Sequence, residues 1–207
     1  MIWVLSYFMM VNFSVTAAAE DLSNYAPELH TSGRGTTIFE LRNLFMGKKE
    51  LIEYTQNLTK LRYDDCEFII KECERENIDP FMLLGIIRRE SNFNPKAQGF
   101  AGERGLGQLM GSTAKIVAEN LGYVYDPDML FDSRYNLKLT IAQISYLIDL
   151  YGGDEHKALT AYNRGQQGLV NYMNMGDGKT IDSAVSDYSK TVLQYAKEYK
   201  DNFSKYN

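Results

Sequence analysis

The stretch IIRRESNFNPKA, Ile86–Ala97, places one carboxylate in a run that otherwise builds an apolar helix face. Leu83, Ile86 and Ile87 precede Glu90 by seven, four and three residues. Those spacings put all four side chains on the same face of an α-helix. The sequence therefore predicts a helix that carries Glu90 among aliphatic side chains.

Local signals mark both ends of this helix. Asp79 is of a residue type that caps helices, and Pro80 suits the first helical position. Pro95 cannot lie inside a helix, so the helix has to end before it. Glu90 then lies in the last turn, where the negative end of the helix dipole disfavours a further negative charge.

A carboxylic acid in these surroundings holds its proton more tightly, because its charged form loses hydration on burial. An acid that stays neutral near pH ~7 can protonate a poor leaving group. The alternative is that Glu90 has a structural role, because ion-pair networks also perturb pKa values. In that interpretation Glu90 pairs with Arg88, Arg89 or Arg104.

Two further segments carry polar groups suited to a binding site. GFAGERGLGQLMGSTA, Gly99–Ala114, is rich in glycine, which lets backbone line a cleft closely, and Gln108 adds an amide that donates and accepts hydrogen bonds. ALTAYNRG, Ala158–Gly165, presents Tyr162 and Asn163 where a helix ends. Read separately, these segments are equally consistent with a surface hairpin, a core tyrosine and a helix-ending asparagine.

The fold class is all-α, with a Gly-rich insert. Helical periodicity begins at Ile38, and no alternating strand pattern exceeds a few residues, apart from a possible short hairpin over 102–110. We expect two or three helices up to Cys73, a helix from Pro80 with Glu90 near its end, and further helices over 112–121, 136–151, 154–162 and 182–203. Ser112 or Thr113 is expected to cap the first of these later helices.

The two cysteines are expected to be core residues and not a disulfide. Cys66 and Cys73 lie seven residues apart, which on one helix separates their Cα atoms by roughly 10 Å. A disulfide requires less than about 7 Å. The only histidines, His30 and His156, lack ligand spacing to these cysteines, so no metal site is expected.

Charge and the N-terminal segment restrict the setting. The net charge of −5, without a basic block, argues against a nucleic-acid partner. Residues 1–19 carry no charge and end in three alanines, which predicts a cleaved signal peptide or an anchor and a periplasmic or secreted, cell-envelope location. Residues 20–37 are expected to form a flexible linker, and residues 38–207 the functional domain.

Taken in order, these segments resemble the lytic transglycosylases of the soluble-transglycosylase (SLT) type, which have a goose-lysozyme-like fold. The resemblance spans roughly Ile78 to Gly168, with a weaker resemblance in the helix expected over Tyr188–Tyr199. It is carried by Glu90-Ser91, Asn94-Pro95-Lys96-Ala97, Gly105-Leu106-Gly107-Gln108-Leu109-Met110 and Ala161-Tyr162-Asn163-Arg164-Gly165. Each motif is modestly specific, but the ordered set is a strong signal.

The sequence departs from the family pattern around the Gly-rich segment. Gly107 replaces the usual Met, which predicts more room at that wall, and Gly111 replaces the usual Pro. Gly99 stands where many members have Ser, so one hydroxyl contact is missing. Glu103 stands where the family usually has a small residue.

The resemblance implies cleavage of peptidoglycan between N-acetylmuramic acid and N-acetylglucosamine, with no metal and no cofactor. Glu90 would act first as general acid and then as general base, giving a 1,6-anhydro end on the muramic acid. The same resemblance implies substrate contacts from Ser91, Gln108, Met110, Tyr162 and Asn163. Partners in cell-envelope or virion assembly are also compatible with it.

Two other functions remain open from the sequence. A muramidase that uses water would need a second carboxylate, and Glu103 is the candidate, although it could simply pair with Arg104. A non-catalytic glycan-binding assembly module would not need an acid on an apolar face.

Overall fold

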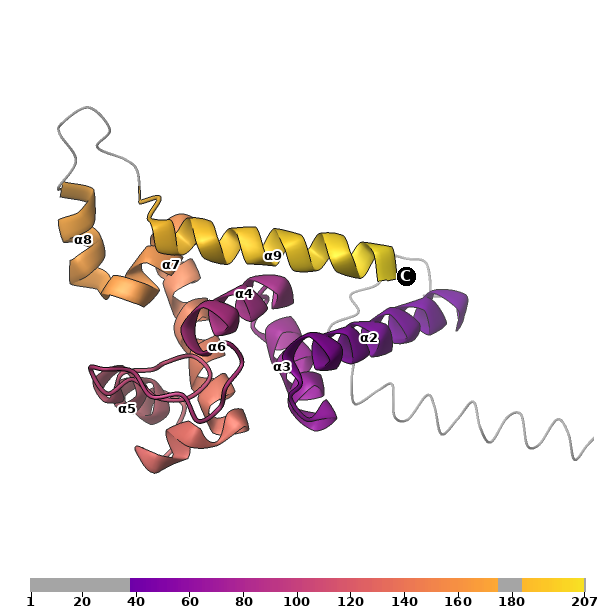
Figure 1. Ribbon diagram of the computed structural model, residues 1–207, viewed down its shortest axis with the longest axis horizontal. Helices are drawn as coiled ribbons and strands as arrows, with labels where there is room; N and C mark the ends of the chain where they lie inside the picture. The colour runs from indigo at the N-terminus through magenta and orange to yellow at the C-terminus, as the bar shows by residue number, and fades with distance from the viewer. Residues whose placement is uncertain (1–37, 175–183, 207) are drawn as a thin grey trace, which may run out of the picture. The chain divides into compact units, whose positions relative to one another are not determined.

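The structure, a computed structural model, describes residues 38–174 and 184–206 (Figure 1). The predicted signal peptide and linker lie outside these residues. The described chain is helical and confirms the all-α prediction. Its elements are α2 (Ile38–Thr59), α3 (Tyr63–Arg75), α4 (Pro80–Ser91), α5 (Gly111–Asn120), the 3₁₀ turn η1 (Asp128–Phe131), α6 (Ser133–Leu150), α7 (Glu155–Arg164), α8 (Gln166–Asn174) and α9 (Asp187–Tyr206).

The chain divides into two compact units, Met1–Leu44 and Phe45–Asn207. All side-chain contacts described below belong to the second unit. Across the described residues, no helix combines the length and the apolar character needed to span a bilayer.

The helix that carries Glu90 has the predicted ends. It begins at Pro80, and the Asp79 side chain accepts a hydrogen bond of 2.8 Å from the backbone N–H of Phe81. It ends at Ser91, where Asn92 takes up the left-handed conformation with a φ of 51°. Aspartate caps also begin α6 and α7, so short polar residues set several of the helix boundaries.

The structure differs from the sequence predictions at several helices. Helix α5 begins at Gly111 after Met110, without a side-chain cap, so neither Ser112 nor Thr113 caps it. Helix α9 begins at Asp187, five residues later than expected, because a pair of serines described below caps it there. Helix α8, which buries only Leu169, was not predicted, since one buried residue gives no periodic signal.

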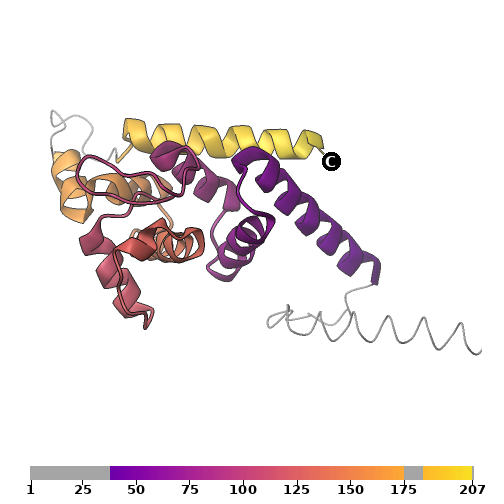
Figure 2. The ribbon, with the colours of Figure 1, turned by 60° about the horizontal axis from the view of Figure 1, so that its bottom comes forward.

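Helix α4 forms the centre of the core. Every residue from Phe81 to Ile87 is buried, and α9 lies along this helix in both views (Figures 1 and 2). A Cβ at Gly85 would lie 2.5 Å from the carbonyl oxygen of Val192, so the glycine allows α9 to approach closely. Cys66 and Cys73 are buried and unpaired, as predicted.

The Gly-rich segment between α4 and α5 forms a folded loop. Isolated antiparallel bridges join Gln98 to Arg104 and Arg104 to Leu109, so the hairpin is present only as these two bridges. The loop is attached to α6 through Asn136, which is fully buried. Its amide nitrogen donates to the carbonyls of Arg104 and Leu130, both at 2.9 Å, and its oxygen accepts from Gly107 N–H at 2.8 Å.

Candidate active site

The predicted acid, Glu90, is partly buried in the last turn of α4. Its Oε1 atom accepts a hydrogen bond of 2.5 Å from the hydroxyl of Tyr188, a buried side chain in the first turn of α9. The resemblance implied a substrate contact for Tyr162 and assigned no role to Tyr188. In this structure Tyr188 makes the direct contact.

Burial is the main reason that the pKa of Glu90 is raised above its ordinary value. The Tyr188 hydroxyl and the charge of Arg89 lower this pKa, and the charge of Glu103 raises it, so the net effect is a carboxyl group that holds its proton more tightly than a free one. In return, the charge of Glu90 adds to burial in raising the pKa values of Tyr162 and Tyr188. Glu90 is therefore the centre of a coupled group of ionisable side chains.

Of the three arginines considered as structural partners of Glu90, Arg89 acts on it through its charge, and the other two are bonded elsewhere. Arg88 bonds to Asn92, and Arg104 forms an ion pair of 3.0 Å with Asp128. Among the described residues, no ion pair includes Glu90. Its environment is that of a partly desolvated acid with a hydroxyl donor.

A small network fixes the start of α9 and thereby Tyr188. The backbone N–H of Ser189 donates to Ser186 Oγ, and the N–H of Ser186 donates to Ser189 Oγ, both at 3.1 Å, in the reciprocal manner of a capping box. Thr160, in α7, donates to the carbonyl of Ala184 at 2.6 Å. Because these contacts join α7 to the beginning of α9, they position the hydroxyl that meets Glu90.

Tyr162 ties α7 to the Gly-rich loop. Its hydroxyl donates to the carbonyl of Gly107 at 2.8 Å, and its ring packs against both hydrophobic clusters of the core. A Cβ at Gly107 would lie 2.1 Å from Thr140 Oγ1 and 2.9 Å from the Tyr162 hydroxyl. The room expected beside Gly107 is therefore occupied, and the glycine serves close packing.

Gln108 and Glu103 lie together against Gly99. A Cβ at Gly99 would come within 2.2 Å of Glu103 Oε2 and 3.0 Å of Gln108 Oε1. Gln108 Nε2 donates to the carbonyls of Ala97 and Gly105 at 3.1 and 2.9 Å. Because both amide hydrogens are used within the loop, the Gln108 oxygen is directed towards Glu103 and Gly99.

The other predicted site residues differ in their surroundings. Ser91 is buried, and its hydroxyl donates to the Ile87 carbonyl at 3.1 Å, so it serves the helix end. Met110 is 40 % exposed immediately before α5. Asn163 is exposed in the last turn of α7, next to Tyr162.

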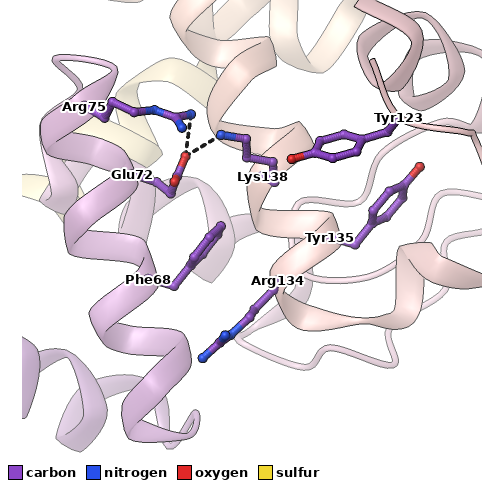
Figure 3. A pocket seen from close by; sticks show the side chains of 7 residues that line it. All are labelled: Phe68, Glu72, Arg75, Tyr123, Arg134, Tyr135 and Lys138. Carbon is purple, nitrogen blue, oxygen red and sulfur yellow. Dashed lines mark hydrogen bonds and ion pairs between the residues drawn. The ribbon is translucent and has the colours of Figure 1, made fainter. Parts of the chain in front are cut away.

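A pocket of about 360 Å³ lies apart from the predicted residues, between α3, α6 and the segment after α5 (Figure 3). Its lining is Phe68, Glu72, Arg75, Tyr123, Arg134, Tyr135 and Lys138. Glu72 Oε2 joins Arg75 at 2.6 Å and Lys138 at 2.7 Å, so two cations on one wall share a single carboxylate. None of the residues that the motifs indicated lines this pocket, so it is not the site predicted from the sequence.

Sequence reasoning missed two residues that organise the site. Tyr188 lies 98 positions from Glu90, and neither the helical pattern of its segment nor the weak family resemblance there indicated a contact with the acid. Asn136 was placed at a helix start, whereas it lies one turn inside α6. A buried asparagine in an apolar helix face was the available signal, because burial of an amide requires partners.

An all-α core, a partly buried glutamate and a Gly-rich loop next to a tyrosine define a lysozyme-like domain. Residues 67–183 match the family model described as the Transglycosylase SLT domain. The chain belongs to this family.

The relatives share the domain but are longer proteins. A Haemophilus influenzae protein described as a soluble lytic murein transglycosylase is 33 % identical over 114 residues, covering 55 % of this chain and 19 % of the relative. One similar structure is that of an inactive glutamate-to-glutamine mutant of lytic transglycosylase Slt from Pseudomonas aeruginosa. It matches with a TM-score of 0.57 at 25 % identity, and the match covers 68 % of this chain and 25 % of that one. The 70 kDa soluble lytic transglycosylase of Escherichia coli matches with a TM-score of 0.60 at 20 % identity, and the match covers 94 % of this chain and 34 % of that one. This likeness supports the assignment of the fold.

Proposed function

We propose that this chain is a peptidoglycan lytic transglycosylase that cleaves the bond between N-acetylmuramic acid and N-acetylglucosamine. The observation that carries the proposal is the hydrogen-bonded, partly buried Glu90, whose pKa is raised by burial. The names of the relatives support the reaction class, and the inactive Glu-to-Gln form of the Pseudomonas aeruginosa relative supports the use of a glutamate.

In the first step Glu90 donates its proton to the glycosidic oxygen while the bond from that oxygen to the anomeric carbon breaks. A raised pKa serves this step, because the acid remains protonated at higher pH. The N-acetyl group of the substrate stabilises the positive anomeric carbon. The leaving sugar departs with a free hydroxyl.

In the second step the ionised Glu90 takes the proton of the muramic acid 6-hydroxyl, and that oxygen bonds to the anomeric carbon. This closes a 1,6-anhydro ring and returns Glu90 to its starting state, so atoms and charge balance without water. The nucleophile belongs to the substrate, which replaces a bimolecular step by an intramolecular one. The Tyr188 hydroxyl stabilises the carboxylate between the two steps, as a donor to an ionised acceptor.

The remaining residues have supporting roles. Tyr162 holds the Gly107 backbone in place, and Gln108 presents its amide oxygen to the substrate. Met110 and Asn163, which are exposed beside the loop and α7, contact the sugars, while Ser91 stabilises the helix end next to the acid. The proposal includes a location in the cell envelope and partners in cell-envelope or virion assembly.

Product analysis tests the reaction. Purified murein is digested and the fragments are separated by mass, since an anhydro end is one water lighter than a reducing end. We expect anhydro ends from the unmodified protein and from Glu103→Gln. If the unmodified protein gives reducing ends and Glu103→Gln does not, the protein is a hydrolase that uses Glu103 as its second carboxylate. Binding of murein without cleavage would identify a glycan-binding module.

A further inference from the structure

Glu103 is a carboxylate without a cation in the loop next to the acid. Its Oε2 atom accepts one hydrogen bond, of 3.0 Å, from the backbone N–H of Ala101. The neighbouring Arg104 is turned away to Asp128 and to the carbonyl of Pro127. In the part of the chain whose side chains are described, no lysine, arginine or histidine forms an ion pair with Glu103.

A second acceptor lies beside this carboxylate. Gln108 Oε1 and Glu103 Oε2 both lie within 3.0 Å of one point, the position that a Cβ of residue 99 would occupy. The Gln108 amide hydrogens are already used by the carbonyls of Ala97 and Gly105. The two electron-rich oxygens therefore lie close together beside Gly99, where any side chain at residue 99 would collide with them.

From this arrangement we propose that Glu103 and Gln108 bind a primary ammonium group on the substrate. An ammonium group carries three donors and a positive charge, so it satisfies both acceptors and neutralises Glu103. A neutral N-acetyl amide offers one N–H and leaves the charge uncompensated. The inference rests on the proposed function and deepens it, because it names the murein that this site prefers.

Murein offers such an ammonium group from two sources. One is the 2-amino group of a glucosamine that has lost its acetyl group, and the other is a side-chain amine of the stem peptide. Both have the same recognition chemistry. Four substrates separate them: glycan strands with or without stem peptides, each either fully N-acetylated or partly de-N-acetylated.

Binding is measured in the Glu90→Gln background, so that the result does not depend on turnover. We expect about tenfold tighter binding of an amine-bearing substrate than of fully acetylated, peptide-free strands, a factor that corresponds to about 1.4 kcal/mol. Glu103→Gln, which keeps the shape and the acceptor but removes the charge, should reduce this ratio to about one. The preference should also weaken with added salt, because the charges are partly screened.

Glu119→Gln on α5 is the matched control, since Glu119 is an exposed carboxylate outside the site. This variant should keep the preference. Equal binding of all four substrates, or a preference that survives in Glu103→Gln, would overturn the inference. A failure of the proposed function looks different, because the unmodified chain would then release no anhydro ends from any of the four substrates, whatever their order of binding affinity.

Discussion

The hydroxyl of Tyr188 donates to Glu90 Oε1 at 2.5 Å and joins the first turn of α9 to the last turn of α4. The two residues are 98 positions apart in the sequence. Their contact depends on the close packing of the two helices at Gly85 and Val192 and on the serine cap at the start of α9. The state of the acid is thus set by the tertiary structure.

Replacing Tyr188 with Phe removes the donor and leaves the ring. We expect kcat/KM to fall about tenfold to hundredfold, the range that corresponds to a hydrogen bond with a charged group. This bond lowers the pKa of Glu90, so its loss raises that pKa further. The acid then stays protonated to higher pH, and the alkaline limb of the pH–rate profile should move upward.

Tyr195→Phe is the control for this change, because Tyr195 lies on the same helix and stacks on Tyr199 away from the acid. The pH–rate profile of Tyr195→Phe should match that of the unmodified protein. An unchanged alkaline limb in Tyr188→Phe would show that this hydroxyl does not influence the acid during turnover.

Replacing Gly85 with Ala tests how α9 is placed. The new Cβ would lie 2.5 Å from the Val192 carbonyl oxygen, which is backbone and cannot rotate away, so α9 has to shift. We expect a loss of about 1–3 kcal/mol in the free energy of unfolding, as for other overpacked cores. At a temperature where the variant remains folded, its activity should still be lower than that of the unmodified protein, because Tyr188 is displaced. Full activity in a destabilised variant would argue against precise placement of Tyr188.

Gly107→Ala tests the packing of the loop against α6 and α7. Its Cβ would collide with Thr140 Oγ1 and approach the Tyr162 hydroxyl, so both stability and activity should decrease, stability by about 1–3 kcal/mol. Adding Thr140→Ala should restore part of the loss. Gly47→Ala is the control: nothing lies within 4 Å of its Cβ, and in a helix the exchange should be neutral or stabilise by about 0.5–1 kcal/mol. Equal effects at both glycines would contradict the packing argument.

The raised pKa of Glu90 predicts a stability that depends on pH. The folded state holds the proton more tightly than the unfolded chain, so this contribution is complete below the ordinary pKa of about 4.3 and is lost as pH rises through the folded value. The Glu90→Gln variant keeps a neutral acceptor for Tyr188, and because this amide does not ionise, it causes no loss of stability as pH rises. Urea unfolding should therefore show the variant gaining stability relative to the unmodified protein as pH rises above the ordinary glutamate pKa of about 4.3. A difference that is constant with pH would mean that burial does not act on this carboxyl group.

The sequence was most informative where the structure is decided locally. Asp79, Pro80 and the aliphatic spacing fixed α4, and they placed Glu90 correctly because a helix face follows from a few adjacent residues. The Gly-rich segment was recognised as a loop, but its packing was not, because the neighbour of Gly107 is Thr140 on another helix. The space beside a glycine depends on which side chains from other elements pack against it, and the sequence alone does not identify those side chains.

Tyr188 illustrates the other limit. Its segment reads as an amphipathic helix, which predicts a buried side chain but not its partner. The partner follows from the angle and depth at which α9 crosses α4, and these depend on Gly85 and on hydrogen bonds from Thr160. Similarly, an ion pair between Glu103 and Arg104 was one alternative from the sequence, and only the fold shows that Arg104 turns to Asp128.

Turnover of purified murein by Glu90→Gln tests the central claim most directly. The amide cannot give a proton to the glycosidic oxygen or take one from the 6-hydroxyl, so release of soluble fragments should fall by about 10²- to 10⁴-fold. Thermal unfolding of the same preparation confirms that the variant is folded. If the folded variant releases fragments at the rate of the unmodified protein, Glu90 is not the acid.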